Sequence, residues 1–149
     1  MKNTVIRNKK ASFNYEFIEK FIGGIELAGT EIKSIRLGKA SLVDSYCVFH
    51  NNELWVQGMH ISEYYWGNRN NHVPKRERKI LLKRKELNKL LKNTQEKGLT
   101  IIATKIFVND RGWAKIEIAL AKGKKTHDKR EDLKSKDSKR EMDRIKKSF

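Results

Sequence analysis

The stretch "LTIIATKIFVNDRGWAKIEIALA", residues 99–121, decides the fold. Its second half alternates two sets of residues with a period of two, as expected for a strand with one buried and one wet face. The buried set is Ala114, Ile116, Ile118 and Leu120, and the wet set is Trp113, Lys115, Glu117 and Ala119. The first half is rich in β-branched residues, and the intervening "NDRG" favours a tight turn. Residues 99–121 therefore predict a β-hairpin with Lys115 facing solvent.

Further extended segments are predicted upstream of this hairpin. "SYCVFH" (45–50) and "ELWVQGMHI" (53–61) flank the Asn pair at 51–52, and Asn tolerates the left-handed backbone of a two-residue turn. Two more segments, "FNYEFI" (13–18) and "GIELAGTEI" (24–32), lie near the N-terminus, the second of them bounded by Gly23 and Gly24. The chain thus carries six candidate strands.

Helices are fewer. Residues 83–98 place Leu87, Leu90, Leu91 and Thr94 on one stripe, and Gly98 is a natural helix stop. A shorter helical turn is predicted at 32–38, the Asn-rich segment 62–74 is predicted as an irregular loop, and residues 78–82 fit either a strand or a helix start. We expect a mainly β domain, a closed antiparallel Greek-key barrel of the oligonucleotide/oligosaccharide-binding type with about six strands and two or three short helices. A β-sandwich is the alternative.

Residues 122–149 differ in composition from this predicted barrel at 1–121. They hold twelve Lys or Arg and six Asp or Glu, a net charge of +6, with few large apolar side chains. Such a segment buries too little surface to offset its ordering entropy. Met142, Ile145 and Phe149 nevertheless fall on one side of a helix. We expect a basic tail that is disordered alone and helical when docked, with a solvated charge run that has no partner as the alternative.

The overall charge points to a polyanionic partner. Lys and Arg number 34 against 18 Asp and Glu, a formal net charge of +16, so nucleic acid is favoured over a membrane surface. No segment approaches the ~18 consecutive apolar residues of a spanning helix, and "MKNTVIRNKK" lacks the apolar core of a signal peptide. The single cysteine, Cys47, excludes an internal disulfide. We therefore expect a cytoplasmic protein.

Catalytic motifs are weak. The four histidines, His50, His60, His72 and His127, are too scattered for a metal pair, and one cysteine gives no zinc spacing, so no metal or cofactor is expected. A metal-dependent nuclease would need carboxylates such as Glu31, Asp44 or Glu63, although single acidic residues on strands and loops are usually surface features. We expect a binding protein rather than an enzyme.

Four blocks of the chain resemble, in order, those of the small protein B family, whose members partner transfer-messenger RNA in bacterial trans-translation. They are "GTEIKSIRLGKASLVDSYCVF" (29–49), "LWVQGMHIS" (54–62), "GNRNNHVPKRERKILLKRKEL" (67–87) and "AKGKKTHDKRED" (121–132). The resemblance implies a monomeric barrel that binds the tRNA-like elbow of transfer-messenger RNA. It further implies a tail that enters the decoding centre and empty messenger channel of a stalled ribosome. The alanyl-charged RNA, delivered with elongation factor Tu, is then accepted without a codon.

The same resemblance carries over site residues by position. The RNA-binding set is Asn8, Leu82, Lys115, Lys122, Gly123, Lys124 and Lys125. The ribosome-binding set in the tail includes His127, Asp128, Lys129 and Arg130, and the helical stripe adds Met142 and Ile145. Lys115 on a wet strand face suits a phosphate, Gly123 would let the backbone turn into the tail, and His127 suits base stacking. By contrast, Leu82 fits a core position as well as an RNA contact.

Three further positions, Ile22, Val73 and Trp113, need separate comment. Ile22 replaces an acidic residue common in the family, and an apolar side chain there would complete the core, with neighbouring basic residues compensating. Val73 replaces a common Asp before Pro74. Trp113 is expected to pack in the barrel wall more than to stack on RNA. A generic ribosomal or single-stranded RNA-binding module is the alternative function.

Overall fold

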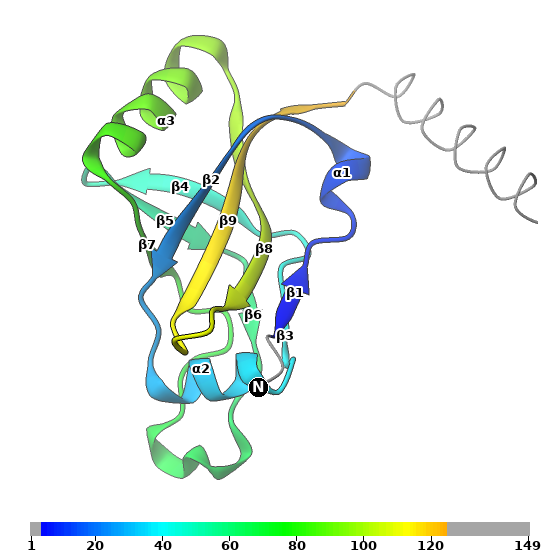
Figure 1. The fold of residues 1–149 in the computed structure, drawn as a ribbon, viewed down its shortest axis with the longest axis vertical. Helices are drawn as coiled ribbons and strands as arrows, with labels where there is room; N and C mark the ends of the chain where they lie inside the picture. Colours follow the sequence, from blue (N-terminus) through cyan, green and yellow to red (C-terminus); the bar gives the residue numbers. More distant parts are fainter. Residues whose placement is uncertain (1–3, 125–149) are drawn as a thin grey trace, which may run out of the picture.

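Six strands form a ring in the computed structural model, which describes residues 4–124 apart from the side chains of residues 68–70. The strands β8 (Thr100–Val108), β4 (Tyr46–His50), β5 (Glu53–Gln57), β7 (Arg78–Leu81), β2 (Tyr15–Ile25) and β9 (Ala114–Gly123) pair in that order, and β9 pairs back with β8. All pairings are antiparallel. Figure 1 shows α3 at one end of this ring and α2 at the other. The predicted closed barrel is confirmed.

Smaller elements extend the ring. β1 (Val5–Arg7) was not predicted and pairs with the second half of β8. β3 (Ala40–Ser41) and β6 (His60–Ile61) form a separate two-stranded sheet. The expected strand 53–61 is therefore divided, because Gly58 adopts a positive φ of 76° and redirects the chain between β5 and β6. The undecided segment 78–82 resolves as β7, and the Asn51–Asn52 turn has both residues at positive φ, as predicted.

The two expected N-terminal strands are in fact one. β2 runs without a break through Gly23 and Gly24, which were predicted to bound a strand, and it follows a short helix, α1 (Ala11–Asn14). Gly23 is required by packing: a Cβ added there would lie 2.7 Å from the carbonyl oxygen of Leu81 and from Cδ2 of Leu82. The pair of glycines therefore marks a close approach between β2 and β7 inside a strand.

The predicted strand at 24–32 is wrong beyond Ile25, because residues 26–28 have no regular secondary structure and α2 (Gly29–Arg36) begins at Gly29. The carboxylate of Glu31 accepts a hydrogen bond from the backbone N–H of Ala28 (2.8 Å), which satisfies one free donor of the first turn. The helical turn predicted at 32–38 is the second half of this helix. α3 (Arg84–Lys97) matches its prediction, and Gly98 ends it in the left-handed conformation.

The ring is filled by aliphatic side chains from every wall strand. Ile116, Ile118 and Leu120 of β9 are buried as predicted, and they share one cluster with residues such as Ile106 and Leu54. The other face of β9 is less wet than its alternation predicts, since Glu117, Ala119 and Ala121 are also buried. The reason is that β9 lies between β2 and β8, and α1 with Tyr15 and Phe17 covers its end. Cys47 is buried in the main cluster.

A buried ion pair was missed from the sequence. Glu31, expected as a surface carboxylate, is fully buried and pairs with the guanidinium of Arg78, which is also fully buried. Arg76 donates to the second carboxylate oxygen of Glu31 at 2.5 Å. Burial alone would raise the pKa of Glu31, but hydrogen bonds from Arg76, the Ala28 N–H and Arg78 lower that pKa below its usual 4.5. Glu31 is therefore structural.

Candidate nucleic-acid interface

The outer surface of the sheet carries two cross-strand rows that run over β1, β8, β9 and β2, and the second continues onto β7. Strand register places Arg7 opposite Lys105, Lys105 opposite Glu117, and Glu117 opposite Ile22. The second row, two residues along, consists of Val5, Phe107, Lys115, Gly24 and Leu81. We call these two rows, with Lys9 and Lys20 beside them, the barrel face. It mixes basic and apolar side chains on a rigid sheet.

Glu117 organises the basic residues of the barrel face. Its carboxylate lies 3.4 Å from Nζ of Lys20 and 3.3 Å from Nζ of Lys105, so it holds an ammonium group from the strand on each side of β9. Burial would raise the pKa of Glu117, but Lys105 above all, with Thr104 and Lys20, lowers it below its usual value. Glu117 therefore stays ionised at neutral pH. The two lysines still carry one net positive charge for a phosphate.

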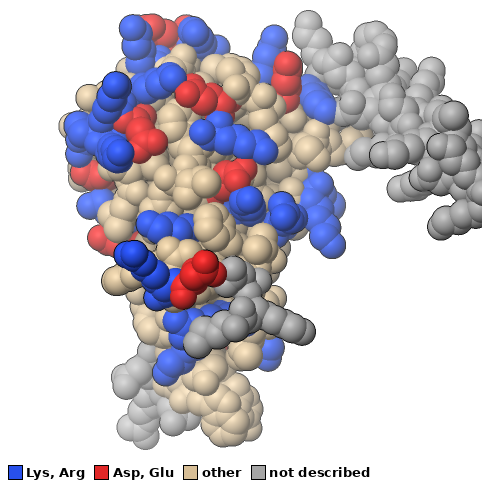
Figure 2. Space-filling model, viewed as in Figure 1, with Lys and Arg blue, Asp and Glu red and all other residues tan. Residues whose placement is uncertain are grey.

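A hollow of about 240 Å³ opens in the barrel face. Its lining combines four basic residues with polar and aromatic ones: Arg7, Asn8, Lys9, Ser12, Phe17, Lys20, Thr104, Lys105 and Glu117. Lys20 lies over the ring of Phe17 and Lys105 over the ring of Phe107, each at 5.5 Å from the centroid. Cations backed by aromatic rings suit a phosphate with its neighbouring sugar or base. Figure 2 shows Lys and Arg outnumbering Asp and Glu on the side where β2 and β9 face the viewer.

Two of the predicted residues, Lys115 and Leu82, lie beside the glycine pair of β2. Lys115 lies opposite Gly24 of β2 and is half-buried. Leu82 is half-buried, packs against the core cluster, and lies directly over Gly23. Gly23 thus makes room for Leu82 on the core side of β2, whereas Lys115 pairs with Gly24, which faces outward. Packing accounts for most of what Leu82 does in the free molecule.

Asn8 lines the hollow but also holds the fold together. Its Nδ2 donates to the carbonyl oxygens of Leu42 (3.1 Å) and Ala103 (3.0 Å), and its backbone N–H donates to Thr104 (2.8 Å). Both donor hydrogens of the amide are therefore used within the protein. Its Oδ1 is the atom through which Asn8 would contact RNA.

The predicted residues at the end of the barrel continue β9. Lys122 pairs with Glu16, Gly123 pairs with Tyr15, and the N–H of Lys124 donates to the carbonyl oxygen of Asn14 (3.0 Å). The strand thus runs two residues past the expected end of the barrel at Ala121. The other predicted positions lie outside the described residues: Lys125, His127, Asp128, Lys129, Arg130, Met142 and Ile145.

Two expectations about apolar residues are wrong. Ile22 does not complete the core, because it is 56% exposed and points outward at the end of the first row, where β2 alternates. Trp113 is 67% exposed and does not pack in the barrel wall, because it precedes β9 in the turn after β8. Val73 is exposed in the loop before Pro74.

Four basic residues of the barrel face were missed from the sequence: Arg7, Lys9, Lys20 and Lys105. Lys105 is the one charged residue in β8 and this signal was available, whereas Lys20 lies beyond the predicted strand 13–18. Arg7 had none, because β1 is only three residues long.

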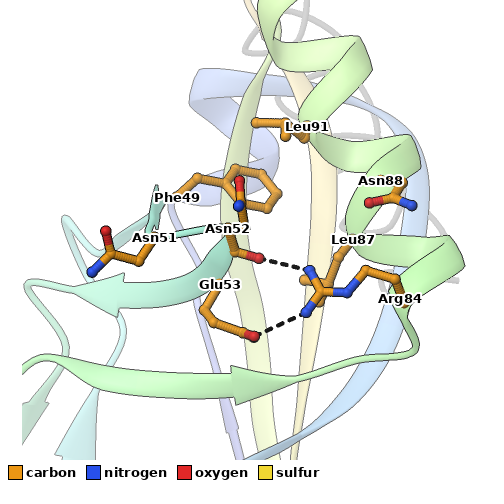
Figure 3. A pocket seen from close by; sticks show the side chains of 8 residues that line it. All are labelled: Phe49, Asn51, Asn52, Glu53, Arg84, Leu87, Asn88 and Leu91. Carbon is orange, nitrogen blue, oxygen red and sulfur yellow. Dashed lines mark hydrogen bonds and ion pairs between the residues drawn. The ribbon is translucent and has the colours of Figure 1, made fainter.

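A second hollow, of about 540 Å³, lies between the β4–β5 turn and α3 (Figure 3). The guanidinium of Arg84 is already held there by the carbonyl oxygen of Asn52 (2.8 Å) and the carboxylate of Glu53 (2.9 Å). Arg84, the one basic residue in the lining, is thus engaged within the protein, so this hollow does not offer the basic surface of the barrel face.

Other kinds of site find no support in the part of the chain that the structure describes. Within residues 4–124, no three His, Cys, Asp or Glu side chains gather as metal ligands would. Over the same residues, no helix is long and apolar enough to cross a membrane.

Known proteins resemble the chain over its whole length. A family model described as "SmpB protein" matches residues 5–148. An SsrA-binding protein of Phocaeicola vulgatus is 60% identical over 140 residues, covering 94% of this chain and 93% of the relative. An SsrA-binding protein of Flavobacterium psychrophilum is 55% identical over 149 residues, covering 100% and 99%. A chain from a solved structure described as "tmRNA-SmpB: a journey to the center of the bacterial ribosome" is 41% identical, with a TM-score of 0.70 and coverage of 83% of this chain and 86% of that one.

Proposed function

This chain belongs to the SmpB protein family, and we propose that its barrel face binds the tRNA-like domain of transfer-messenger RNA in bacterial trans-translation. It is an RNA-binding protein rather than an enzyme, and no step of the proposal makes or breaks a bond. The observation that carries the proposal is the pair of cross-strand rows, which holds Arg7, Lys105 and Lys115 on one rigid surface.

The geometry of the barrel face suits folded RNA. Sheet strands lie about 4.8 Å apart, so basic residues on adjacent strands meet neighbouring phosphates without rearrangement. Gly24 has no side chain of its own, and the side chain of Leu81 lies beside it, within 3.5 Å of where a Cβ would be. Phe107 and Leu81 supply apolar surface for sugars or exposed bases.

The tail carries the second half of the proposed function. Residues 125–149 would enter the decoding centre and the empty messenger channel of the small ribosomal subunit. His127, Asp128, Lys129 and Arg130 would lie at the base of the tail, with Met142 and Ile145 on its docked helical side. The RNA, charged with alanine and delivered by elongation factor Tu, would then be accepted without a codon. The protein would act as a monomer in the cytoplasm.

A competition experiment tests the RNA half. The full chain is bound to labelled tRNA-like domain and challenged with unlabelled tRNA-like domain or with unstructured RNA of equal length, with magnesium and then with chelator. The proposal expects displacement by the folded RNA at far lower concentration, and intact RNA throughout. Equal displacement by both competitors would instead identify a generic RNA-binding module. Cleavage that stops with chelator would identify a nuclease.

A truncation tests the tail. The chain is ended after Lys124 rather than after Ala121, because ending at Ala121 would also remove the last pairs of β9 with β2. The truncated protein should keep its affinity for the tRNA-like domain and lose tagging on stalled ribosomes in a reconstituted translation assay. Loss of both properties together would show that the tail contributes to binding of the tRNA-like domain.

A further inference from the structure

We propose that a second surface of this protein binds an unpaired RNA strand. The surface is the exposed side of α2 together with the aromatic residues at its two ends: Lys33, Arg36 and Lys39 with Tyr65, Trp66 and Trp113. We call it the α2 ridge. α2 lies at one end of the ring (Figure 1), so the ridge adjoins the barrel face but shares no residue with its two rows.

The helix itself supplies a basic stripe. Glu31, Ser34 and Ile35 are buried, so α2 turns its other side to solvent. Within residues 29–39, every exposed charged side chain is basic: Lys33, Arg36 and Lys39. The one acidic residue of the segment, Glu31, is buried and forms an ion pair with Arg78. The stripe therefore presents three basic side chains and no exposed acidic one, while the flanking loops add Glu63 and Asp110.

An aromatic loop stands at the N-terminal end of this stripe. Tyr65 and Trp66 begin a 3-10 turn (η1, Tyr65–Asn70) and are 80% and 72% exposed, with ring centroids 4.7 Å apart and planes at 90°. The amide of Asn71 closes the loop behind them, because it donates to the carbonyl oxygen of Tyr64 (2.6 Å) and accepts from the Tyr64 N–H (2.9 Å). The two rings are therefore presented to solvent on a closed loop.

The same loop is fastened to α2. His72 is buried, with Nδ1 2.8 Å from the hydroxyl oxygen of Thr30 and Nε2 2.9 Å from the carbonyl oxygen of Ile61. Lys33 lies over the ring of Tyr64 at 5.4 Å from the centroid. Helix and aromatic loop therefore form one unit.

A third aromatic ring stands at the other end of α2. Trp113 follows a turn in which Oδ1 of Asn109 accepts from the N–H groups of Arg111 (3.1 Å) and Trp113 (2.9 Å). Arg36 donates to the carbonyl oxygen of Gly112 at 3.3 Å, which ties this turn to the last residue of the helix.

This arrangement matches an unpaired RNA strand. Proteins bind single strands by a basic track for the phosphates and aromatic rings on which bases stack, and the α2 ridge offers both. A duplex does not expose the faces of its bases, and an acidic peptide gains nothing from the ring faces of Tyr65, Trp66 and Trp113. We assign the strand to an RNA other than the folded RNA on the barrel face, since the two surfaces lie on different parts of the ring.

The inference goes beyond the proposed function and can be tested with the full chain. The tryptophans of the protein are Trp55, Trp66 and Trp113, so tryptophan fluorescence does not report RNA bound only by residues 125–149. A hexamer of oligoadenylate is titrated against the protein, and quenching of the fluorescence is followed. The variants are Tyr65→Ala with Trp66→Ala, and Trp113→Ala, while Lys97→Gln at the exposed end of α3 is the matched control.

The expected result is saturable quenching that each aromatic variant weakens by about 5- to 150-fold, the range for losing one stacked base. Lys97→Gln should leave it unchanged, and saturating tRNA-like domain should not displace the hexamer. Equal affinity for duplex RNA or polyglutamate, or unchanged affinity in both aromatic variants, would overturn the inference. Concentration-dependent self-association that the aromatic variants abolish would show instead that a second copy covers the ridge.

The two proposals can fail separately. The displacement arm rests on the proposed function, whereas the hexamer titration does not. A wild-type protein that quenches with the hexamer but does not bind the tRNA-like domain would contradict the proposed function alone. Displacement of the hexamer by the tRNA-like domain would contradict the assignment to a different RNA. Because the substituted side chains are exposed, their circular dichroism and melting temperature should match the wild type.

Discussion

Binding of the tRNA-like domain should depend steeply on salt, with a slope set by the barrel face. Its basic side chains are Arg7, Lys9, Lys20, Lys105 and Lys115. If each neutralises one phosphate, the slope of log K against log salt gains about −0.7 to −0.9 per contact. Five contacts give about −3.5 to −4.5, which is a loss of roughly 100- to 500-fold between about 50 and 200 mM salt.

Substituting one lysine sharpens this prediction. Lys115→Gln should lower the slope by about 0.7 to 0.9, the share of one phosphate, whereas Lys92→Gln on the exposed side of α3 should not change it. Fluorescence anisotropy with labelled tRNA-like domain at five salt concentrations measures both slopes. Any contribution from residues 125–149 cancels, because the variants share them. Equal slopes for Lys115→Gln and wild type would refute the reasoning.

Three further predictions concern stability. Glu31→Gln should cost about 3 to 5 kcal/mol in denaturant unfolding at neutral pH, because Arg78 is left buried and unpaired. Folding lowers the pKa of Glu31 from its usual 4.5, so its contribution to stability is fully present above about pH 4.5 and is lost as the pH falls through the lowered value. The free energy of unfolding of the variant should therefore fall less steeply with acid than that of the wild type, and parallel curves would contradict this. Gly23→Ala should cost about 1 to 3 kcal/mol of stability, because its Cβ would lie 2.7 Å from the carbonyl oxygen of Leu81. Gly24→Ala should cost less, because its nearest atom would lie at 3.5 Å. A lower melting temperature for Gly24→Ala than for Gly23→Ala would contradict the close packing at Gly23. The free energy of unfolding of Gly123→Ala should stay within about 0.5 kcal/mol of wild type, because nothing lies within 4 Å of the added Cβ. A large loss of stability would contradict this geometry. A loss confined to RNA binding would show that the RNA approaches the backbone closely at Gly123.

Local patterns predicted the elements whose signals are local. The hairpin at 99–121 was visible because both strands and their turn are contiguous, and α3 because its leucine stripe ends at Gly98. The start of α2 was misplaced because its apolar residues read as extended. The deciding contact is the hydrogen bond between Glu31 and Ala28, in the opening turn of the helix.

Long-range features had no comparable signal. The Glu31–Arg78 pair joins residues 47 positions apart, and burial of both charges depends on how α2 lies against β7. The barrel face depends on register: Arg7 meets Lys105 only because β1 joins the edge of β8. The resemblance to a known family supplied Leu82 without showing that Gly23 makes room for its side chain over β2.

Lysine footprinting tests most directly whether the barrel face binds folded RNA. Acetylation of each lysine in the full chain is measured by mass spectrometry with and without saturating tRNA-like domain. The account predicts protection of Lys20, Lys105 and Lys115, with Lys92 and Lys97 of α3 modified as fast as in the free protein. Unchanged reactivity at those three lysines, with protection confined to α3 or to residues 125–149, would contradict it.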